Sequence, residues 1–232
     1  MATTSISLIR EQTERLRPPR ALWVPFALGR PLGSADDPEF QKDVMRAAFA
    51  LLSTATEPTI ADYPLEAPDE AGPGQWACPL NLGPIVDDSL TGRLLAEVTR
   101  LRPWAAETRA ARGRTLFGVS GADDVDDVAR ALAAAADDVT VLPPGDWAFD
   151  TPLLIRHLAD DLRTFYHEAI AAQPGAQAPN HDALNEWIFG GTALGDTLQA
   201  VADRLTEADN PMSSLVRGLL IPEGHYRGGS AF

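Results

Sequence analysis

Cysteine is nearly absent from this sequence, and basic residues are scarce beside acidic ones. A single cysteine among 232 residues excludes a disulfide within the chain. Lysine and arginine number 19 against 33 aspartates and glutamates, which gives a net charge of -14. Such a charge repels phosphate backbones and anionic lipid. Neither nucleic acid nor a membrane surface is therefore an expected partner.

Long hydrophobic runs are missing as well. The opening stretch, MATTSISLIREQTERLR, has neither the apolar core of a signal peptide nor a segment long enough to span a membrane. We therefore expect a cytoplasmic protein. The 45% apolar composition is ordinary for a folded chain, and 232 residues can form one large domain or two small ones.

Three common site motifs are also lacking. No glycine-rich nucleotide fingerprint occurs. The stretch GADDVDDVARALA lacks the spaced oxygen ligands and the closing glutamate of a calcium loop. In GVSGA, valine precedes Ser120 and no triad partner is indicated, so this is not a nucleophile elbow.

The clearest buried strand is the apolar run ALWVPF at residues 21–26, because breakers bound it on both sides. Residues 5–9 predict an earlier strand, and the charged residues 10–17 predict a short helix that stops at Pro18. Two parallel strands are expected from this order, with any ligand at their carboxyl ends. Trp23 is predicted to be a core residue of the second strand.

The loop GRPLG, which follows this strand, is the best candidate site. Gly29 and Gly33 permit backbone angles closed to other residues, Pro31 restricts the chain between them, and Arg30 is a permanent cation. We expect Gly29, Arg30, Pro31 and Gly33 to contact a small-molecule ligand. The alternative is that Arg30 merely pairs with a nearby carboxylate such as Asp37.

The same stretch carries a resemblance to a known family. The run SISLIREQTERLRPPRALWVPFALGRPLG, followed by DPEFQKDVMRAAFALL, resembles the C-terminal part of the B-component (selenoprotein B-like) family of glycine/sarcosine/betaine and D-proline reductases. WACPLNL and LRPWAAETRAARGRTLFGVSG resemble more weakly the segment that follows. In that family a cysteine or selenocysteine motif lies upstream of the matching strand. The resemblance implies a reductase component whose redox thiol or selenol comes from another chain.

The remaining pattern predicts an α/β fold: a small parallel sheet with helices at the N-terminus, in residues 1–55, followed by a mainly helical C-terminal region. Asp37 caps and Pro38 opens a helix that should cover the sheet. Prolines and glycines crowd residues 56–86, which predicts a linker or wrapping arm without a long regular element.

The C-terminal two thirds are predicted to be helical. In residues 87–148 we expect one helix over 89–102, a second that restarts at Pro103, and one more strand over 114–119. In residues 149–222 we expect a helix capped by Asp150 or Thr151, a long helix bent near Gly190, and a short helix from Pro211. Residues 223–232 are predicted to be a loose tail.

Cys78 is the only thiol, in the sequence WACPLNL, and no cationic residue near it would lower its pKa. We expect it to be buried and inert. Trp76 beside it should pin the arm to a neighbouring surface. Even a reactive lone cysteine would need a partner thiol from elsewhere.

Histidine and carboxylates share one face of a predicted helix. His157, Asp161 and Glu168 stack at helical spacing and could ligate a metal, with His181 or Glu186 adding ligands. The spacing lacks the second histidine of a zinc-binding helix, and a solvated polar face is the alternative. No metal is therefore assigned, and the sequence identifies no cofactor.

Three functional hypotheses remain open. The first is the reductase-like component that works on a small molecule with a partner's thiol or selenol. The second is a non-catalytic binding or assembly protein that keeps the family's half-fold, and the third is a metal-dependent enzyme that uses the helical histidine and carboxylate face. Unpaired edges of so small a sheet also predict a homo-oligomer or a partner chain that bears the redox cysteine.

Overall fold

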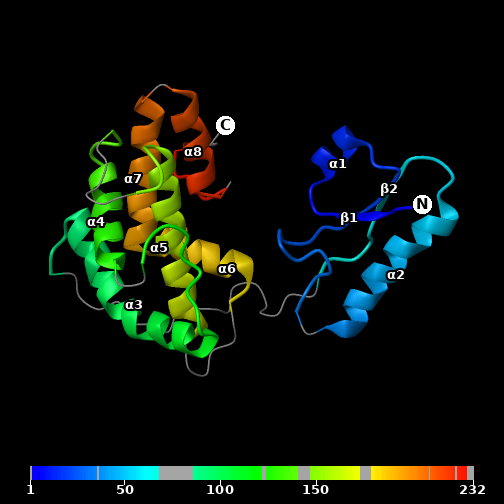
Figure 1. Cartoon of the computed structure of the whole chain (residues 1–232), viewed down its shortest axis with the longest axis horizontal. Coiled ribbons are helices and arrows are strands. Elements are labelled where there is room, and N and C mark those ends of the chain that lie inside the picture. The colour runs from blue at the N-terminus through cyan, green and yellow to red at the C-terminus, as the bar shows by residue number, and fades with distance from the viewer. Residues whose placement is uncertain are drawn as a thin grey trace. The chain divides into compact units, whose positions relative to one another are not determined.

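The computed structural model describes residues 2–35, 37–67, 86–121, 124–140, 147–172, 179–208, 210–222 and 224–228. The chain forms two units, Met1–Pro73 and Gly74–Phe232 (Figure 1). The first holds a small parallel sheet and the second is built of helices, so the predicted α/β fold is confirmed. Among the helices of the described residues, none combines the length and the apolar character that crossing a membrane requires.

The sheet has three parallel strands in the order β1-β2-β3: β1 is Ser5–Ser7, β2 is Arg20–Trp23 and β3 is Thr59–Asp62. The first two overlap the strands predicted at residues 5–9 and 21–26, but both are shorter. The third lies in the proline-rich stretch that was expected to be a linker or arm. The strand predicted at residues 114–119 is wrong, because this segment is a loop.

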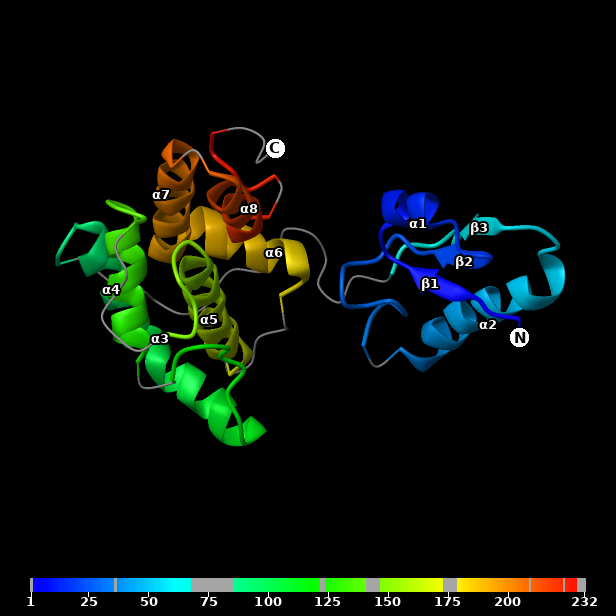
Figure 2. The ribbon, with the colours of Figure 1, turned by 45° about the horizontal axis from the view of Figure 1, so that its top comes forward.

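Alternation along β2 divides the side chains between the two faces of the sheet. Leu22 belongs to the core under helix α2, Pro38–Thr54, together with Val44 and Leu51. Trp23 points to the other face, where the guanidinium of Arg10 lies 5.5 Å from its ring centre. Helix α1, Arg10–Leu16, and α2 accordingly lie on opposite sides of the strands (Figure 2).

Trp23 is half-buried, so its prediction as a core residue is wrong. Its ring is covered on one side by the Arg10 side chain, which belongs to an exposed helix. Truncation of Trp23 to alanine should therefore cost less than the roughly 3–5 kcal/mol of a fully buried tryptophan.

Both ends of α2 are held by side chains. The carboxylate of Asp37 accepts a hydrogen bond from the Phe40 backbone N–H at 3.1 Å, and Pro38 opens the helix, as predicted. At the other end, Arg20 donates to the carbonyls of Leu51 and Ala55, both at 3.0 Å. Arg20, in the central strand, thus satisfies carbonyl groups at the C-terminal end of the helix that covers the sheet.

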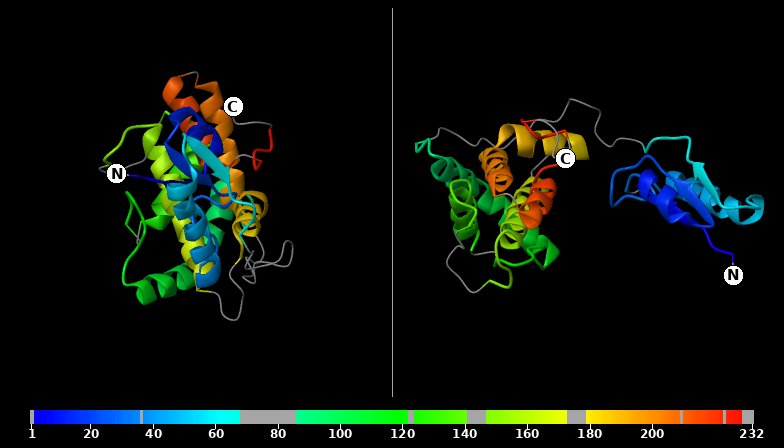
Figure 3. Two further views of the ribbon diagram at one scale, coloured as in Figure 1. Left: turned by 90° about the vertical axis from the view of Figure 1, so that its right-hand side faces the viewer. Right: turned by 90° about the horizontal axis from the view of Figure 1, so that it is seen from above.

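The second unit is a helical bundle whose elements are α3 (Leu90–Arg112), α4 (Val125–Ala135), α5 (Leu153–Ala171), α6 (His181–Asn185), the π-helical segment η1 (Glu186–Gly190), α7 (Ala193–Glu207) and α8 (Pro211–Leu220). Helix α5 packs against α3, α4 and α8, while α7 packs against the same three helices (Figure 3). The largest fully buried side chains include Tyr166, Phe165, Leu94, Leu158 and Leu198.

Several predictions for this unit need correction. Helix α3 runs through Pro103 without a break, and Pro103 itself is exposed. Neither Asp150 nor Thr151 caps α5, whose N-cap residue is Pro152. The bend near Gly190 is confirmed: the π-helical segment ends there, and the Thr192 side chain caps α7.

Residues 224–228 contact α7 and α8 and do not form a loose tail. Arg227 donates to the Asp196 carboxylate at 2.6 Å, and its backbone N–H donates to Gln199 at 3.3 Å. The Tyr226 hydroxyl donates to the carbonyl of Arg217. These contacts anchor the described part of the C-terminal segment.

Candidate functional site

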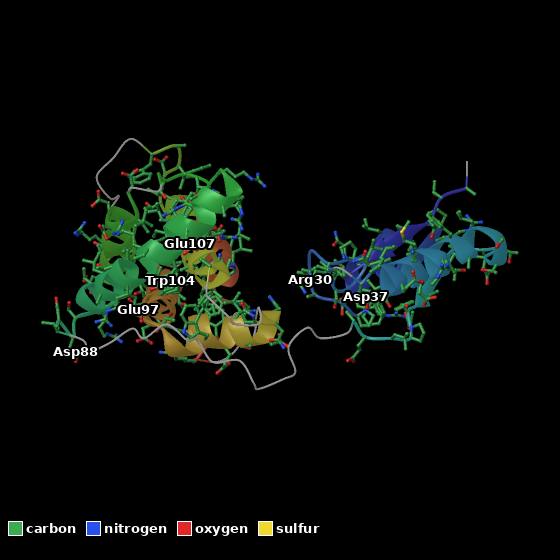
Figure 4. All side chains as sticks on the ribbon, turned by 90° about the horizontal axis from the view of Figure 1, so that it is seen from below. Arg30, Asp37, Asp88, Glu97, Trp104 and Glu107 are labelled. Atoms are coloured by element: carbon green, nitrogen blue, oxygen red, sulfur yellow. The ribbon has the colours of Figure 1, made fainter. Side chains whose placement is uncertain are left out.

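The loop after β2 presents an exposed cation at the carboxyl end of the central strand. Gly29 and Gly33 have φ angles of 88° and 86°, in the left-handed region that favours glycine. Arg30 between them is exposed, and it has no ion-pair partner among the described residues (Figure 4). The Asp37 carboxylate caps α2 instead, and Asp36 lies outside the described residues.

Gly33 fixes the far end of this loop. A Cβ atom at this position would lie 2.6 Å from Cε1 of Phe40, closer than packing allows. The backbone turns tightly here, since the Gly33 N–H donates to the Arg30 carbonyl at 3.0 Å. At Gly29, by contrast, a Cβ atom would meet nothing within 4 Å. The loop is therefore anchored at Gly33 and open at Gly29 and Arg30.

An aromatic cluster supports the anchored end. The ring of Phe40 lies 5.6 Å from that of Phe26 and 5.9 Å from that of Tyr63, measured between ring centres. The Tyr63 hydroxyl donates to Asp43 at 2.9 Å. Burial, together with this hydrogen bond to a carboxylate, raises the pKa of Tyr63 to about 12. Tyr63 thus stays protonated and acts as a fixed donor.

Sequence reasoning missed a groove that runs beside the loop. It has a volume of about 460 Å³ and lies between β1, the loop and α2. Its apolar lining consists of Ile6, Pro31, Leu32, Met45, Ala48 and Phe49. The available signal was the spacing of Met45 and Phe49, one helical turn apart and outside the predicted core stripe of α2.

The histidine and carboxylates of α5 do not converge on a metal site. The ring of His157 stacks on Phe149 at 4.2 Å, while Glu168 pairs with Arg109 at 3.5 Å and Arg112 at 3.6 Å. Asp161 instead accepts hydrogen bonds from the backbone of residues 118–120. Within the described ranges, no three histidine, cysteine, aspartate or glutamate residues lie close enough to hold a metal ion.

Asp161 is buried and closes the loop that was predicted to be a strand. Its carboxylate accepts hydrogen bonds from the backbone N–H groups of Gly118, Val119 and Ser120 at 2.5, 3.0 and 2.7 Å. The Ser120 hydroxyl adds a fourth at 2.8 Å. These donors occupy the carboxylate, so the solvated polar face predicted for α5 is wrong at Asp161.

Glu168 is also buried, with its side chain 1% exposed. Burial raises its pKa, against the opposing effects of Arg109, a backbone hydrogen bond from Leu116, and Arg112. The arginines come from the last turns of α3. Glu168 therefore joins α5 to the end of α3 and is not a solvated residue.

A second buried carboxylate, Glu97 on α3, was not identified from the sequence. It accepts hydrogen bonds from the Tyr166 hydroxyl at 2.6 Å and from the Ala193 N–H at 2.9 Å, at the start of α7. Burial raises the pKa of Glu97, while these donors act in the opposite direction. No motif marks such a residue, because its partners lie 69 and 96 positions away along the chain.

Asp196 on α7 links two arginines from distant parts of the second unit. Arg93 and Arg227 each approach its carboxylate at 2.6 Å. Burial acts to raise the pKa of Asp196, but the hydrogen bonds from Arg227 and Arg93 outweigh it, so the pKa is lowered. This carboxylate fastens the C-terminal segment and α3 to α7.

The remaining candidate ligands make local contacts. Nε2 of His181 lies 3.0 Å from Nδ2 of Asn185, and the Asn180 side chain caps α6. Glu186 lies 3.9 Å from His225. Cys78 and Trp76 are outside the described residues, so the expectations for them stay predictions.

Comparison with protein-family models, with curated proteins and with solved structures finds no match for this chain. The candidate site therefore rests on geometry alone: an anchored loop with an exposed arginine, beside an apolar groove.

Proposed function

We propose that this chain is a component of a reductase-like system that acts on a small molecule, with the redox thiol or selenol supplied by another chain. Arg30 is the observation that carries this proposal. It is an exposed cation on a loop at the carboxyl end of the central strand, and ligands of parallel sheets bind at this edge. The resemblance of this stretch to reductase B components supplies the reaction class.

The expected ligand is a small molecule with a carboxylate or phosphate group. A guanidinium can bind either group through two parallel hydrogen bonds. The space around Gly29 leaves the adjoining backbone accessible to such a ligand. In this role Arg30 orients the ligand and does not perform the redox chemistry.

The need for a partner follows from the number of cysteines in the sequence. Reduction by a thiol ends in a disulfide, and the sequence contains only Cys78. A second sulfur or a selenol must therefore come from another molecule. We expect the partner to be a cytoplasmic chain that carries a cysteine or selenocysteine motif.

A search of the neighbouring genes and a co-purification test this proposal. We expect an adjacent gene to encode a chain with the redox motif. The two chains should co-purify, and they should sediment as a complex in analytical ultracentrifugation. A strictly monomeric chain at micromolar concentration, with no co-purifying partner and no such gene, would contradict the proposal.

A non-catalytic binding or assembly role is the second candidate, and the groove favours it. Met45 and Phe49 are 40% and 56% exposed, so α2 exposes an apolar surface to solvent beside the sheet. Stable binding of a partner without any dithiol-dependent turnover would select this role. The metal-dependent alternative is not proposed, because its residues on α5 lie apart.

A further inference from the structure

Among the described residues, the backbone groups on the outer edge of β1 have no strand partner. The carbonyl of Ser7 accepts a hydrogen bond from the Val24 N–H at 2.9 Å, so the backbone of Ser7 faces β2. Backbone groups alternate in direction along a strand, and the N–H and C=O of Ile6 therefore point away from β2. Among the described strands, β1 pairs with β2 alone. Ile6 thus offers one donor and one acceptor to an added strand.

The groove lies beside this edge and suits the side chains of an extended segment. Ile6 lines it from β1, Leu32 lines it from the loop, and Phe49 lines it from α2. In an extended segment alternate side chains point to the same side. One set can therefore fill the apolar groove of about 460 Å³ while the backbone pairs with Ile6.

The charge next to the groove indicates the charge that a bound segment should carry. Arg30 directly precedes the lining residue Pro31. Arg30 is exposed and has no ion-pair partner among the described residues. Lys42, by contrast, pairs with a glutamate on its own helix at 2.9 Å. An uncompensated cation beside the groove, in a chain of net charge -14, favours an acidic occupant.

We propose that this groove docks an extended segment of the partner chain, with alternating apolar and acidic side chains, which adds to the sheet beside β1. The inference rests on the proposed function, because it assumes a partner, and it names the surface and the chemistry through which that partner binds. Apolar side chains enter the groove, an acidic side chain contacts Arg30, and the segment backbone bonds to Ile6.

The probe is a fluorescently labelled peptide of about nine residues that alternates valine and glutamate. Fluorescence anisotropy should show saturable binding, which Phe49→Ala weakens about fivefold or more. Because Phe49 is 56% exposed, this substitution should leave the fold intact, and circular dichroism melting checks that. The control is Leu215→Ala, at a residue of α8 with 52% exposure, which should leave the affinity unchanged.

Two further peptides separate the contributions of charge and backbone. A valine and lysine peptide should bind about tenfold more weakly at low salt than the glutamate peptide. Backbone N-methylation on one set of alternate residues should abolish binding, whereas N-methylation on the other set should be tolerated. This difference is specific to strand addition, because only one set of N–H groups faces β1.

Several results would overturn the docking proposal. These are no saturation up to about 1 mM peptide, equal affinity for the lysine peptide, or no effect of Phe49→Ala in a folded variant. Binding of decanoate in place of the peptide would assign the groove to small amphiphiles, and a dimer lost in Phe49→Ala would assign it to a second copy. If the groove variant binds the thiol-bearing partner normally while Arg30→Gln abolishes turnover, the docking proposal fails and the proposed function stands.

Discussion

The hydroxyl of Tyr166 donates a hydrogen bond to Oε2 of Glu97 at 2.6 Å, inside a helical core where the Tyr166 ring is completely buried. The second oxygen of Glu97 accepts from the first residue of α7. One carboxylate thus joins α3, α5 and the N-terminus of α7. Burial and the neighbouring Glu97 raise the pKa of Tyr166 well above its ordinary value.

This arrangement predicts a pH-dependent stability. Burial raises the pKa of Glu97 above its ordinary value of 4.5, so the folded chain binds the proton more tightly than the unfolded chain. The stabilising contribution of protonated Glu97 is full below the ordinary value and is lost as pH rises through the folded-state pKa. In Glu97→Gln the free energy of unfolding should fall less from about pH 4.5 to neutrality.

Urea titrations across this pH range measure the effect. The control is Glu107→Gln, at an exposed glutamate of the same helix, which should keep the pH profile of the parent. A Glu97→Gln profile parallel to that of the parent would show that Glu97 titrates normally in the folded chain.

The loop held by Asp161 gives a second prediction. Asp161→Asn replaces a charged acceptor of four hydrogen bonds with an amide whose NH₂ group cannot accept from backbone N–H groups. We expect a loss of about 2–4 kcal/mol in the free energy of unfolding. Thermal and denaturant melts measure it, with the exposed Asp88→Asn as the control. Equal stability of the two variants would mean that the loop does not depend on Asp161.

The two loop glycines should respond differently to alanine. Both have positive φ angles, which should cost about 1–2 kcal/mol in each variant. Only at Gly33 does the new methyl group also collide with Phe40. The free energy of unfolding of Gly33→Ala should therefore be about 1–3 kcal/mol lower than that of Gly29→Ala, and its melting temperature should be lower. Equal melting temperatures would show that the Phe40 ring moves aside without cost.

Local signals were sufficient for the elements that carry the loop. The apolar run around Leu22, the Asp37-Pro38 cap and the helix that starts at Pro211 each depend on a few adjacent residues, and each lies where the sequence predicts it. The strand β3 could not be predicted in this way. Thr59–Asp62 lies among prolines, and it becomes a strand only by pairing with β2.

Partners distant in sequence explain the remaining differences. Residues 118–120 look like part of a strand but bond to Asp161, 41 to 43 positions further on. Glu168 lies on a face that reads as solvated, yet Arg109 and Arg112 from another helix cover it. The loop glycines and Arg30 were identified from the sequence, whereas the groove requires three segments to meet.

Dithiol-dependent turnover by the reconstituted pair tests the central claim most directly. The chain is combined with the proposed thiol-bearing or selenol-bearing partner, and loss of a small substrate of the resembling reductases is followed with and without dithiol. We predict turnover that requires both chains, falls about tenfold or more in Arg30→Gln, and is unchanged in the exposed control Arg15→Gln. Equal turnover by the partner alone, or by Arg30→Gln and the parent, would contradict the account.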